Sequence, residues 1–289
     1  LIIRDDCSVD TTIDIAHEFR RVAKFPVSII KNKTNLGFLK NFELSASAAR
    51  HDIVFLSDQD DIWHPDKIEV FMDTFNSHKN CGYVFSDAIL IDSKNNLVGA
   101  SLWSIVGFSR YRRRKFSGGM QLEVMLNGGN FVYGNGLAFR NCFRDLIYPM
   151  PNKGNSNVAS HDVWISLILS LTGAYGIAVP KTLYSYRQHS QQIVGAQVKV
   201  AVTRLVELEQ WAEWVYLFQA LLAKTNDFSS DFGSRQQVIQ KMRHLEARLE
   251  ISKRPVILRV FLACKELLTF RYFRFSRGFL SWCKDIYLG

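Results

Sequence analysis

The stretch of sequence that decides the fold is residues 53–63, which read IVFLSDQDDIW. An apolar run typical of a buried strand is followed by Asp58, Asp60 and Asp61, and Pro65 then favours the start of a helix. Three carboxylates on one short loop repel one another unless a cation holds them together, so we expect a hard divalent cation there. The alternative is a solvated acidic turn in which one aspartate caps the helix, although a cap needs one carboxylate and not three.

Outward from this loop, the first 90 residues alternate between two patterns. Apolar runs at 1–4, 27–30, 53–57 and 83–86 are separated by helical patterns at 9–23, 38–49 and after Pro65. This alternation predicts an α/β fold with a mixed, mainly parallel sheet flanked by helices. The carboxyl ends of parallel strands meet at one edge, where ligands bind. Asp5, Asp6 and Ser8 follow the first strand, so we expect them to face the same crevice as the acidic loop; a helix cap is the alternative.

The pattern becomes less regular after residue 87. Further strands are expected at 88–91, 97–98, 137–140, 175–179 and 183–187, and helices at 163–171, 198–224 and 235–252. We therefore expect a body at 1–195 and a C-terminal helical region at 196–289, which ends in a basic, aromatic segment at about 255–289.

The charge of the chain is distributed unevenly. Lys and Arg total 36 against 27 Asp and Glu, a net charge of +9, which favours an anionic partner such as nucleic acid, a phosphorylated substrate or an acidic membrane. Residues 235–289 contain 12 Lys and Arg against 4 Asp and Glu, so +8 of the +9 lies in this segment. The body is nearly neutral, and its cationic cluster at 110–115 is offset by acidic residues elsewhere.

The end of the basic segment has a helical periodicity. If 271–288 is one helix, a step of ~100° per residue places Arg274, Arg277, Lys284 and Asp285 on one side and most of the aromatic residues on the other. A helix of this kind is typical of a membrane interface with anionic lipid. The alternative is that the aromatic side chains pack on the body while the basic face meets water.

Cysteine usage and hydropathy indicate the compartment. The five cysteines are odd in number and widely spaced, which argues against a disulfide framework or structural zinc site and favours a reducing compartment. The uncharged stretch at 163–180 is interrupted by Gly173, Gly176 and Pro180, so we expect no transmembrane helix. The expected location is cytoplasmic, at the inner face of the cell membrane.

Six separated segments of the sequence are similar to motifs of one family. They read RDDCS at 4–8, NLGFLKNF at 35–42, DQDDIW at 58–63, GNGLAFR at 134–140, SHDVW at 160–164 and YRQHSQQIVG at 186–195. In this order they resemble glycosyltransferase family 2, and in particular its bacterial rhamnosyltransferase-like members, which build surface polysaccharides. The resemblance covers residues 1–194 and implies the GT-A fold.

The resemblance implies a nucleotide-sugar site on the first two segments. Asp6 matches the residue that binds the nucleobase of the donor, with Asp5 beside it. Asn35 and Lys40 belong to the segment that follows and are assigned to the same nucleotide-sugar site. The first strand of the family and its Pro-x-Tyr-Asn loop should precede Leu1, so we expect this chain to be an N-terminally incomplete member.

The resemblance also implies a metal site and a base. Asp60, with Asp58, matches the Asp-x-Asp signature that binds Mg²⁺ or Mn²⁺, and Asp58 also faces the nucleotide sugar. Asp162 matches the general base that takes the acceptor proton. Arg187 is expected beside the diphosphate and His189 in the metal shell, while Gln192 stands where asparagine is usual.

Together these expectations describe an inverting transferase. The donor is a nucleoside-diphosphate sugar, biased towards dTDP-rhamnose, and the acceptor is a glycan or a lipid-linked glycan. Two alternatives stay open. An aspartyl-phosphate phosphatase also places Asp58 and Asp60 after an apolar strand, but it needs a lysine and a further aspartate pair. A nucleic-acid-binding module would use the basic residues, but no nucleic-acid motif is present, and we expect no nucleic-acid partner.

Overall fold

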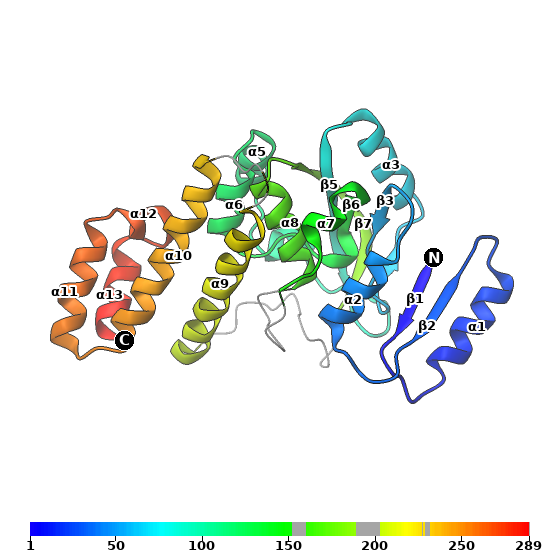
Figure 1. Cartoon of the computed structure of the whole chain (residues 1–289), viewed down its shortest axis with the longest axis horizontal. Helices are drawn as coiled ribbons and strands as arrows, with labels where there is room; N and C mark the ends of the chain where they lie inside the picture. The colour runs from blue at the N-terminus through cyan, green and yellow to red at the C-terminus, as the bar shows by residue number, and fades with distance from the viewer. Residues whose placement is uncertain (152–159, 189–202, 227, 229–231, 289) are drawn as a thin grey trace.

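The computed structural model describes residues 1–151, 160–188, 203–226, 228 and 232–288. The N-terminal strands form a sheet of their own. β1 (Ile2–Asp5) and β2 (Ser28–Lys31) pair in parallel and are joined by α1 (Thr12–Val22). Figure 1 places this unit at one end of the molecule, next to α2 (Phe38–Ser47).

A five-stranded sheet occupies the centre of the molecule. Its order is β3 (Ile53–Phe55), β6 (Leu137–Arg140), β5 (Cys81–Ile91), β7 (Tyr175–Arg187) and β4 (Ile62–Trp63). β5 and β7 are parallel, whereas the other three pairings are antiparallel. β3, β5 and β7 therefore run in one direction, but they are not all neighbours, so this sheet is mixed as predicted and not mainly parallel. β6 and β4 run in the opposite direction. β6 lies between β3 and β5, and β4 forms the edge of the sheet next to β7.

Both faces of this sheet are covered. Along β5, Tyr83 and Phe85 pack into the larger core, whereas Val84 points to the opposite face and packs with Phe71 and Phe75. The latter two side chains come from α3 (Lys67–Ser77). The larger core is covered mainly by α6 (Gln121–Gly128) and α8 (His161–Leu171). Shorter elements complete the body: α4 (Leu102–Ile105), α5 (Arg110–Ser117), η1 (Gly134–Gly136), η2 (Asn141–Phe143) and α7 (Arg144–Ile147).

The C-terminal region is helical, as predicted. α9 (Arg204–Lys224) and α10 (Phe232–Ser252) pack against each other, and Trp211, Leu217 and Phe218 of α9 belong to the same hydrophobic core as Trp164 of α8. The core of the body therefore continues into this region. The boundary at residue 195 lies outside the described residues and stays a prediction. No helix in the described residues is both long and apolar enough to cross a bilayer.

The prediction of one helix over residues 271–288 is wrong. The segment contains α12 (Arg271–Phe275) and α13 (Phe279–Tyr287), preceded by α11 (Val256–Leu267), and these helices lie at the end of the molecule opposite the N-terminal unit (Figure 1). The break falls at Gly278, whose φ of 58° suits glycine.

Because of this break, the aromatic and charged residues do not lie on the two sides that a single helix would give them. Asp285 was expected on the cationic, solvent-facing side, but it is fully buried. Its carboxylate accepts hydrogen bonds from Arg248 at 2.6 Å, from Arg204 at 2.9 Å and from the Tyr272 hydroxyl at 2.7 Å. This buried network, rather than an outward-facing helix, fixes α13 against α9, α10 and α12.

Candidate active site

The acidic loop between β3 and β4 carries three partly buried carboxylates, those of Asp58, Asp60 and Asp61. Burial, together with the neighbouring charges of Asp61, Asp162 and Asp60, raises the pKa of Asp58 to about 6, although His161 opposes this shift. Burial and the charge of Asp60 raise the pKa of Asp61 to about 7. The acidic loop and the start of α8 therefore lie within electrostatic reach of each other, as the order of the motifs implied.

Asn135 of η1 holds this loop in place. Its Oδ1 atom accepts a hydrogen bond from the Trp63 indole at 2.6 Å and one from the backbone N–H of Asp58 at 3.3 Å. Its carbonyl oxygen accepts a hydrogen bond from the ammonium of Lys67. The side chain of Asn135 is fully buried, so each of these bonds is shielded from water and constrains the loop.

Lys67 lies underneath the acidic loop. Its ammonium is buried and sits 3.7 Å from the centre of the Trp63 ring. Burial lowers the pKa of Lys67 to about 7, although the charges of Asp58 and Asp61 act in the opposite direction. Lys67 is therefore a titratable amine beside the acidic loop that the sequence did not reveal.

Arg187, at the end of β7, fixes the acidic loop through its backbone. Its Nε donates to the carbonyl oxygen of Asp60 at 2.6 Å, and its backbone N–H donates to Asp61 Oδ1 at 2.8 Å. Its Nη1 donates to the carbonyl oxygen of Asp92 and to Asn95 Oδ1. The sequence predicted that Arg187 contacts the diphosphate; in the structure these hydrogen bonds join three loops of the protein.

Asp162 lies in the first turn of α8 and is buried. Its Oδ1 accepts hydrogen bonds from the Ser160 hydroxyl and from the backbone N–H of Val163 at 2.8 Å. The positive end of the helix dipole favours a carboxylate at this position. The preceding His161 stacks on Phe42 of α2, with ring centres 4.1 Å apart. The motif therefore packs the start of α8 against α2 and presents Asp162 beside the acidic loop.

Asp6 joins β1 to the segment before α2. Its carboxylate accepts hydrogen bonds from the backbone N–H groups of Leu36 and Gly37 and from the side chain of Asn32, each at 2.8 Å. The side chain of Asn35 donates to the carbonyl oxygen of Asp6 at 3.3 Å. The first two motifs are thus brought together, as predicted, through hydrogen bonds within the protein.

Two other predicted nucleotide-site residues are also bonded within the protein. Asp5 is buried, and its Oδ2 accepts from the backbone N–H of Ser8 at 3.0 Å. Lys40 forms an ion pair with the buried Glu43, which also accepts a hydrogen bond from the backbone N–H of Met150 at 2.7 Å. Asp5, Asp6, Asn35 and Lys40 stay predictions as nucleotide-sugar ligands. His189 and Gln192 lie outside the described residues.

The carboxylates fit a divalent cation that is completed by its substrate. Asp61 Oδ2 is buried and has no hydrogen-bond partner among the described residues. Buried polar atoms are normally paired, so a bound cation would satisfy this oxygen. The described residues contain no group of three His, Cys, Asp or Glu side chains able to hold a metal alone. Mg²⁺ is typically held by one or two carboxylates and substrate phosphates, so Asp58, Asp60 and Asp61 are the residues that would hold it.

Sequence reasoning missed Lys67 and the role of Asn135. In the sequence, nothing distinguishes Lys67 from any other lysine near the start of a helix, so its burial beside the acidic loop could not be predicted. Asn135 lay inside a quoted motif, where two flanking glycines were the one signal of a constrained backbone. The pairing partners of Asn135 are 72 and 77 residues away, so no local pattern could identify them.

Comparison with known proteins identifies the family. Residues 1–141 match the family model described as glycosyl transferase family 2. The chain is 27% identical over 88 residues to a protein of Haemophilus influenzae named "Uncharacterized glycosyltransferase", covering 30% of this chain and 28% of that protein. It is 26% identical over 208 residues to the "dTDP-rhamnosyl transferase RfbG" of Shigella flexneri, covering 68% of this chain and 65% of that protein. The chain thus spans less than two thirds of the length of both curated relatives.

One solved structure shares the fold. The crystal structure of S. aureus TarS 1-349 is 13% identical, with a TM-score of 0.52 over 84% of this chain and 61% of that one. The mannosyltransferase PcManGT from Pyrobaculum calidifontis, solved with GDP-Man and Mn²⁺, is also 13% identical, with a TM-score of 0.46 over 93% of this chain and 64% of that one. At this identity the TarS likeness establishes the mixed α/β GT-A fold and nothing further. Residues 1–141 thus match glycosyltransferase family 2, and the chain has the mixed α/β GT-A fold.

Proposed function

We propose that this protein is a metal-dependent, inverting glycosyltransferase that moves a sugar from a nucleoside diphosphate to a glycan or lipid-linked acceptor. The observation that carries the proposal is the placement of Asp162 beside the acidic loop, where its charge contributes to the raised pKa of Asp58. The proposal thus puts a base next to a cation-binding loop, as transfer between a hydroxyl and a diphosphate-linked sugar requires.

Each carboxylate has a distinct role in this reaction. Asp58 and Asp60, with Asp61, would hold Mg²⁺ or Mn²⁺, which would supply positive charge that stabilises the departing diphosphate. Asp162 accepts the proton of the acceptor hydroxyl as that hydroxyl attacks the anomeric carbon from the opposite face. The attack inverts the anomeric centre. Asn135, Lys67 and Arg187 position the acidic loop without touching the reacting atoms.

The donor is proposed to be dTDP-rhamnose. This choice rests on the printed name of the Shigella relative, which is 26% identical to this chain. The test is a panel of nucleotide sugars incubated with the protein, with and without Mg²⁺ or Mn²⁺, and with Asp162→Asn and Asp60→Asn as variants. We expect metal-dependent release of one nucleoside diphosphate, lost in both variants. Absence of turnover with every donor, or wild-type turnover in both variants, would overturn the proposal.

The observations do not favour the two alternatives raised by the sequence. In the cationic cluster of α5, Arg112 donates to the carbonyl oxygen of Gly107 at 2.9 Å and Arg113 to that of Phe108 at 2.7 Å. Lys115 lies 3.8 Å from Glu123. These side chains hold their own helix in place rather than forming a free phosphate-binding surface. A phosphatase is disfavoured by the match of residues 1–141 to a glycosyltransferase family model.

The protein is further proposed to dock on an anionic membrane through α11. Ile257, Val260, Phe261 and Leu268 are all exposed and lie on one stripe of this helix, opposite its buried residues Ala263 and Glu266. Exposed cations at 253, 254 and 265 flank this stripe. An apolar stripe with flanking cations suits the interface of an anionic bilayer.

Liposome co-sedimentation tests this docking. We expect binding to vesicles that contain anionic lipid, weak binding to neutral vesicles, and loss of binding in Ile257→Asp with Phe261→Asp. Val22→Asp on α1 is the matched control, because Val22 is equally exposed but lies in the N-terminal unit. Binding that survives the α11 substitutions would contradict the assignment.

A further inference from the structure

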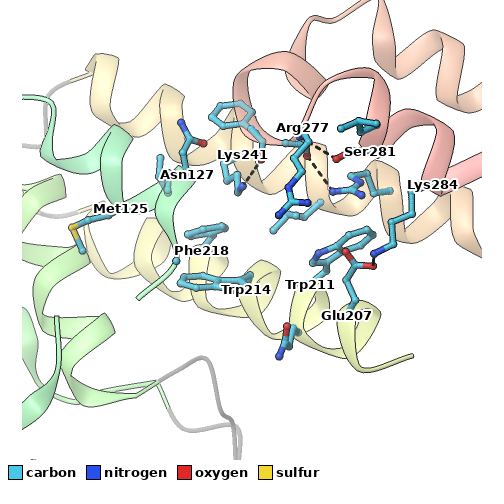
Figure 2. A pocket seen from close by; sticks show the side chains of 18 residues that line it. Met125, Asn127, Glu207, Trp211, Trp214, Phe218, Lys241, Arg277, Ser281 and Lys284 are labelled. Atoms are coloured by element: carbon cyan, nitrogen blue, oxygen red, sulfur yellow. Dashed lines mark hydrogen bonds and ion pairs between the residues drawn. The ribbon is translucent and has the colours of Figure 1, made fainter. Parts of the chain in front are cut away.

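A cavity of about 450 Å³ lies between the body and the C-terminal helices, where α6, α9, α10, α12 and α13 meet. Figure 2 shows its lining, with side chains from α9 and α10 facing those of the last two helices. None of the residues assigned to the donor or metal site lines this cavity. Its volume is in the range of small-molecule binding sites.

One wall of the cavity is aromatic. Trp214 and Phe218 lie along α9 with ring centres 5.4 Å apart, and Trp211 lies one turn before them. Trp211 is covered by the Arg248 guanidinium, 3.8 Å from the ring centre, whereas Trp214 is only partly buried. A flat, partly exposed ring of this kind packs well against the C–H face of a sugar.

The opposite wall is strongly cationic. Lys241, Arg248, Arg277 and Lys284 line the cavity against a single acid, Glu207. Two of these cations are neutralised: Arg248 pairs with Asp285, and Lys284 pairs with Glu207 at 2.7 Å. Lys241 and Arg277 form no ion pair with an acidic side chain among the described residues.

Lys241 is the more unusual of these two cations. Its ammonium donates to the carbonyl oxygen of Phe275 at 3.0 Å, and burial, with the nearby charge of Arg248, lowers its pKa to about 8. Lys241 is partly buried, and holding a lysine there without a carboxylate costs free energy unless an anion joins it. Arg277 is exposed and points towards the cavity in Figure 2, so an entering anion can reach both side chains.

We propose that this cavity binds a phosphorylated sugar, with the phosphate between Lys241 and Arg277 and the sugar ring along Trp214. The exposed amide of Asn127 also lines the cavity and can contact the sugar hydroxyls, whereas the hydroxyls of Ser276 and Ser281, which line it too, already bond to His244 and Arg248 and to the backbone N–H of Arg277. The proposal does not rest on the proposed transferase activity, because no residue of the acidic loop takes part.

Isothermal titration calorimetry with EDTA present tests the proposal, since the metal-dependent donor site is then silent. The probes are glucose 1-phosphate, inorganic phosphate and glucose. We expect glucose 1-phosphate to bind more tightly than either of the others. Arg277→Met and Lys241→Met should each weaken it by ~10-fold or more. Trp214→Leu should remove the advantage of glucose 1-phosphate over phosphate.

Two controls keep the result interpretable. Lys253→Met removes an exposed cation outside the cavity and should leave binding unchanged, and Asp60→Asn should bind like the wild type. No heat from glucose 1-phosphate in the folded protein, or equal binding by wild type and Arg277→Met, would overturn the proposal. Loss of binding in Asp60→Asn would also overturn it, because the ligand would then occupy the donor site.

A final arm identifies the source of the phosphate. Vesicles of phosphatidylcholine with phosphatidylinositol present a cyclitol phosphate on a lipid, and vesicles with phosphatidylglycerol present equal charge without a ring. If Arg277→Met reduces binding to the first vesicles only, the cavity takes a lipid-borne headgroup. If it reduces binding of glucose 1-phosphate and leaves both vesicles unchanged, the ligand is a soluble or polymer-borne sugar phosphate. Equal loss from both kinds of vesicle, without loss of glucose 1-phosphate binding, contradicts the proposal.

Discussion

The indole nitrogen of Trp63 donates a hydrogen bond to Asn135 Oδ1 at 2.6 Å, joining the end of the acidic loop to the turn before β6. The same oxygen accepts from the backbone N–H of Asp58, at the start of that loop. One buried amide therefore holds both ends of the segment that carries the aspartates. Because the loop is held at both ends, its carboxylates keep a fixed spacing before any cation binds.

Substitution of Asn135 by alanine should destabilise the fold. The Trp63 indole and the Asp58 backbone would lose their acceptor inside the protein, and a buried unpaired donor costs about 1–3 kcal/mol. Urea unfolding at neutral pH measures the change in the free energy of unfolding. Asn127→Ala serves as the control, because Asn127 is exposed. Equal stability of the two variants would contradict the role of Asn135.

Substitution of Asp162 by asparagine should separate chemistry from donor binding. The amide keeps the size and much of the hydrogen bonding of the carboxylate but cannot accept the acceptor proton, so turnover should fall by ~100-fold or more. The affinity for the nucleotide sugar should be unchanged. Asp145→Asn is the matched control, since Asp145 also lies in the first turn of a short helix but is exposed. A parallel loss of donor affinity would show that Asp162 acts in binding instead.

Asp61→Asn should weaken the binding of Mn²⁺. The unpartnered Oδ2 would be replaced by a neutral amide, and the loss of one carboxylate next to a metal costs ~10–100-fold in metal affinity. Titration of activity with Mn²⁺ after treatment with a chelator gives the concentration needed for half-maximal turnover. Asp66→Asn, at an exposed position near the same loop, should need no more Mn²⁺ than the wild type. An unchanged requirement in Asp61→Asn would remove Asp61 from the metal site.

His244 should make the stability of the C-terminal helices sensitive to acid. Burial lowers the pKa of His244, although its partner Glu266 opposes the shift. The folded protein therefore binds a proton at His244 less readily than the unfolded chain. The resulting stability is complete above the unfolded pKa of about 6.5 and is lost as pH falls towards the folded value.

The measurement is the free energy of unfolding from pH 8 to pH 5, compared between wild type and His244→Gln. The difference between the two proteins removes the contributions of the raised pKa values of Asp58 and Asp61, which run in the opposite direction. We expect the wild type to lose up to ~1.4 kcal/mol per pH unit more than the variant below pH 6.5. Parallel curves would mean that His244 titrates normally.

Gly278→Ala distinguishes the observed tail from a continuous helix. In a helix interior this change would stabilise the protein by about 1 kcal/mol. In the structure, a Cβ at residue 278 would lie 2.9 Å from the Phe273 ring at a φ of +58°, so we expect a loss of about 1–3 kcal/mol. Gly99→Ala is the control, because its φ of +100° is also positive but nothing lies within 4 Å. A gain in stability from Gly278→Ala would instead support one continuous helix over 271–288.

The sequence predicted the parts of the fold that depend on local pattern. Local patterns predicted three elements that the structure contains: the strand at 137–140, the acidic loop and the helix after Ser160. Each depends on an apolar run or on carboxylates within a few residues of sequence. The prediction for the tail failed for a physical reason: Gly278 allows a turn that divides 271–288 into two helices, and Asp285 of the second helix is buried instead of exposed. The environment of the acidic loop could not be predicted for a different reason. Asn135 and Lys67 contact this loop only after β6 and α3 have packed.

The shared core of α8 and α9 has a consequence for how this enzyme can be divided. Leu217 and Phe218 are buried in the same cluster as Trp164, two residues from Asp162. A polypeptide cut at residue 195 would uncover that cluster and leave the helix carrying the proposed base without its outer support. The C-terminal helices therefore support the proposed active site, so recombination between relatives should exchange the two segments together rather than separately.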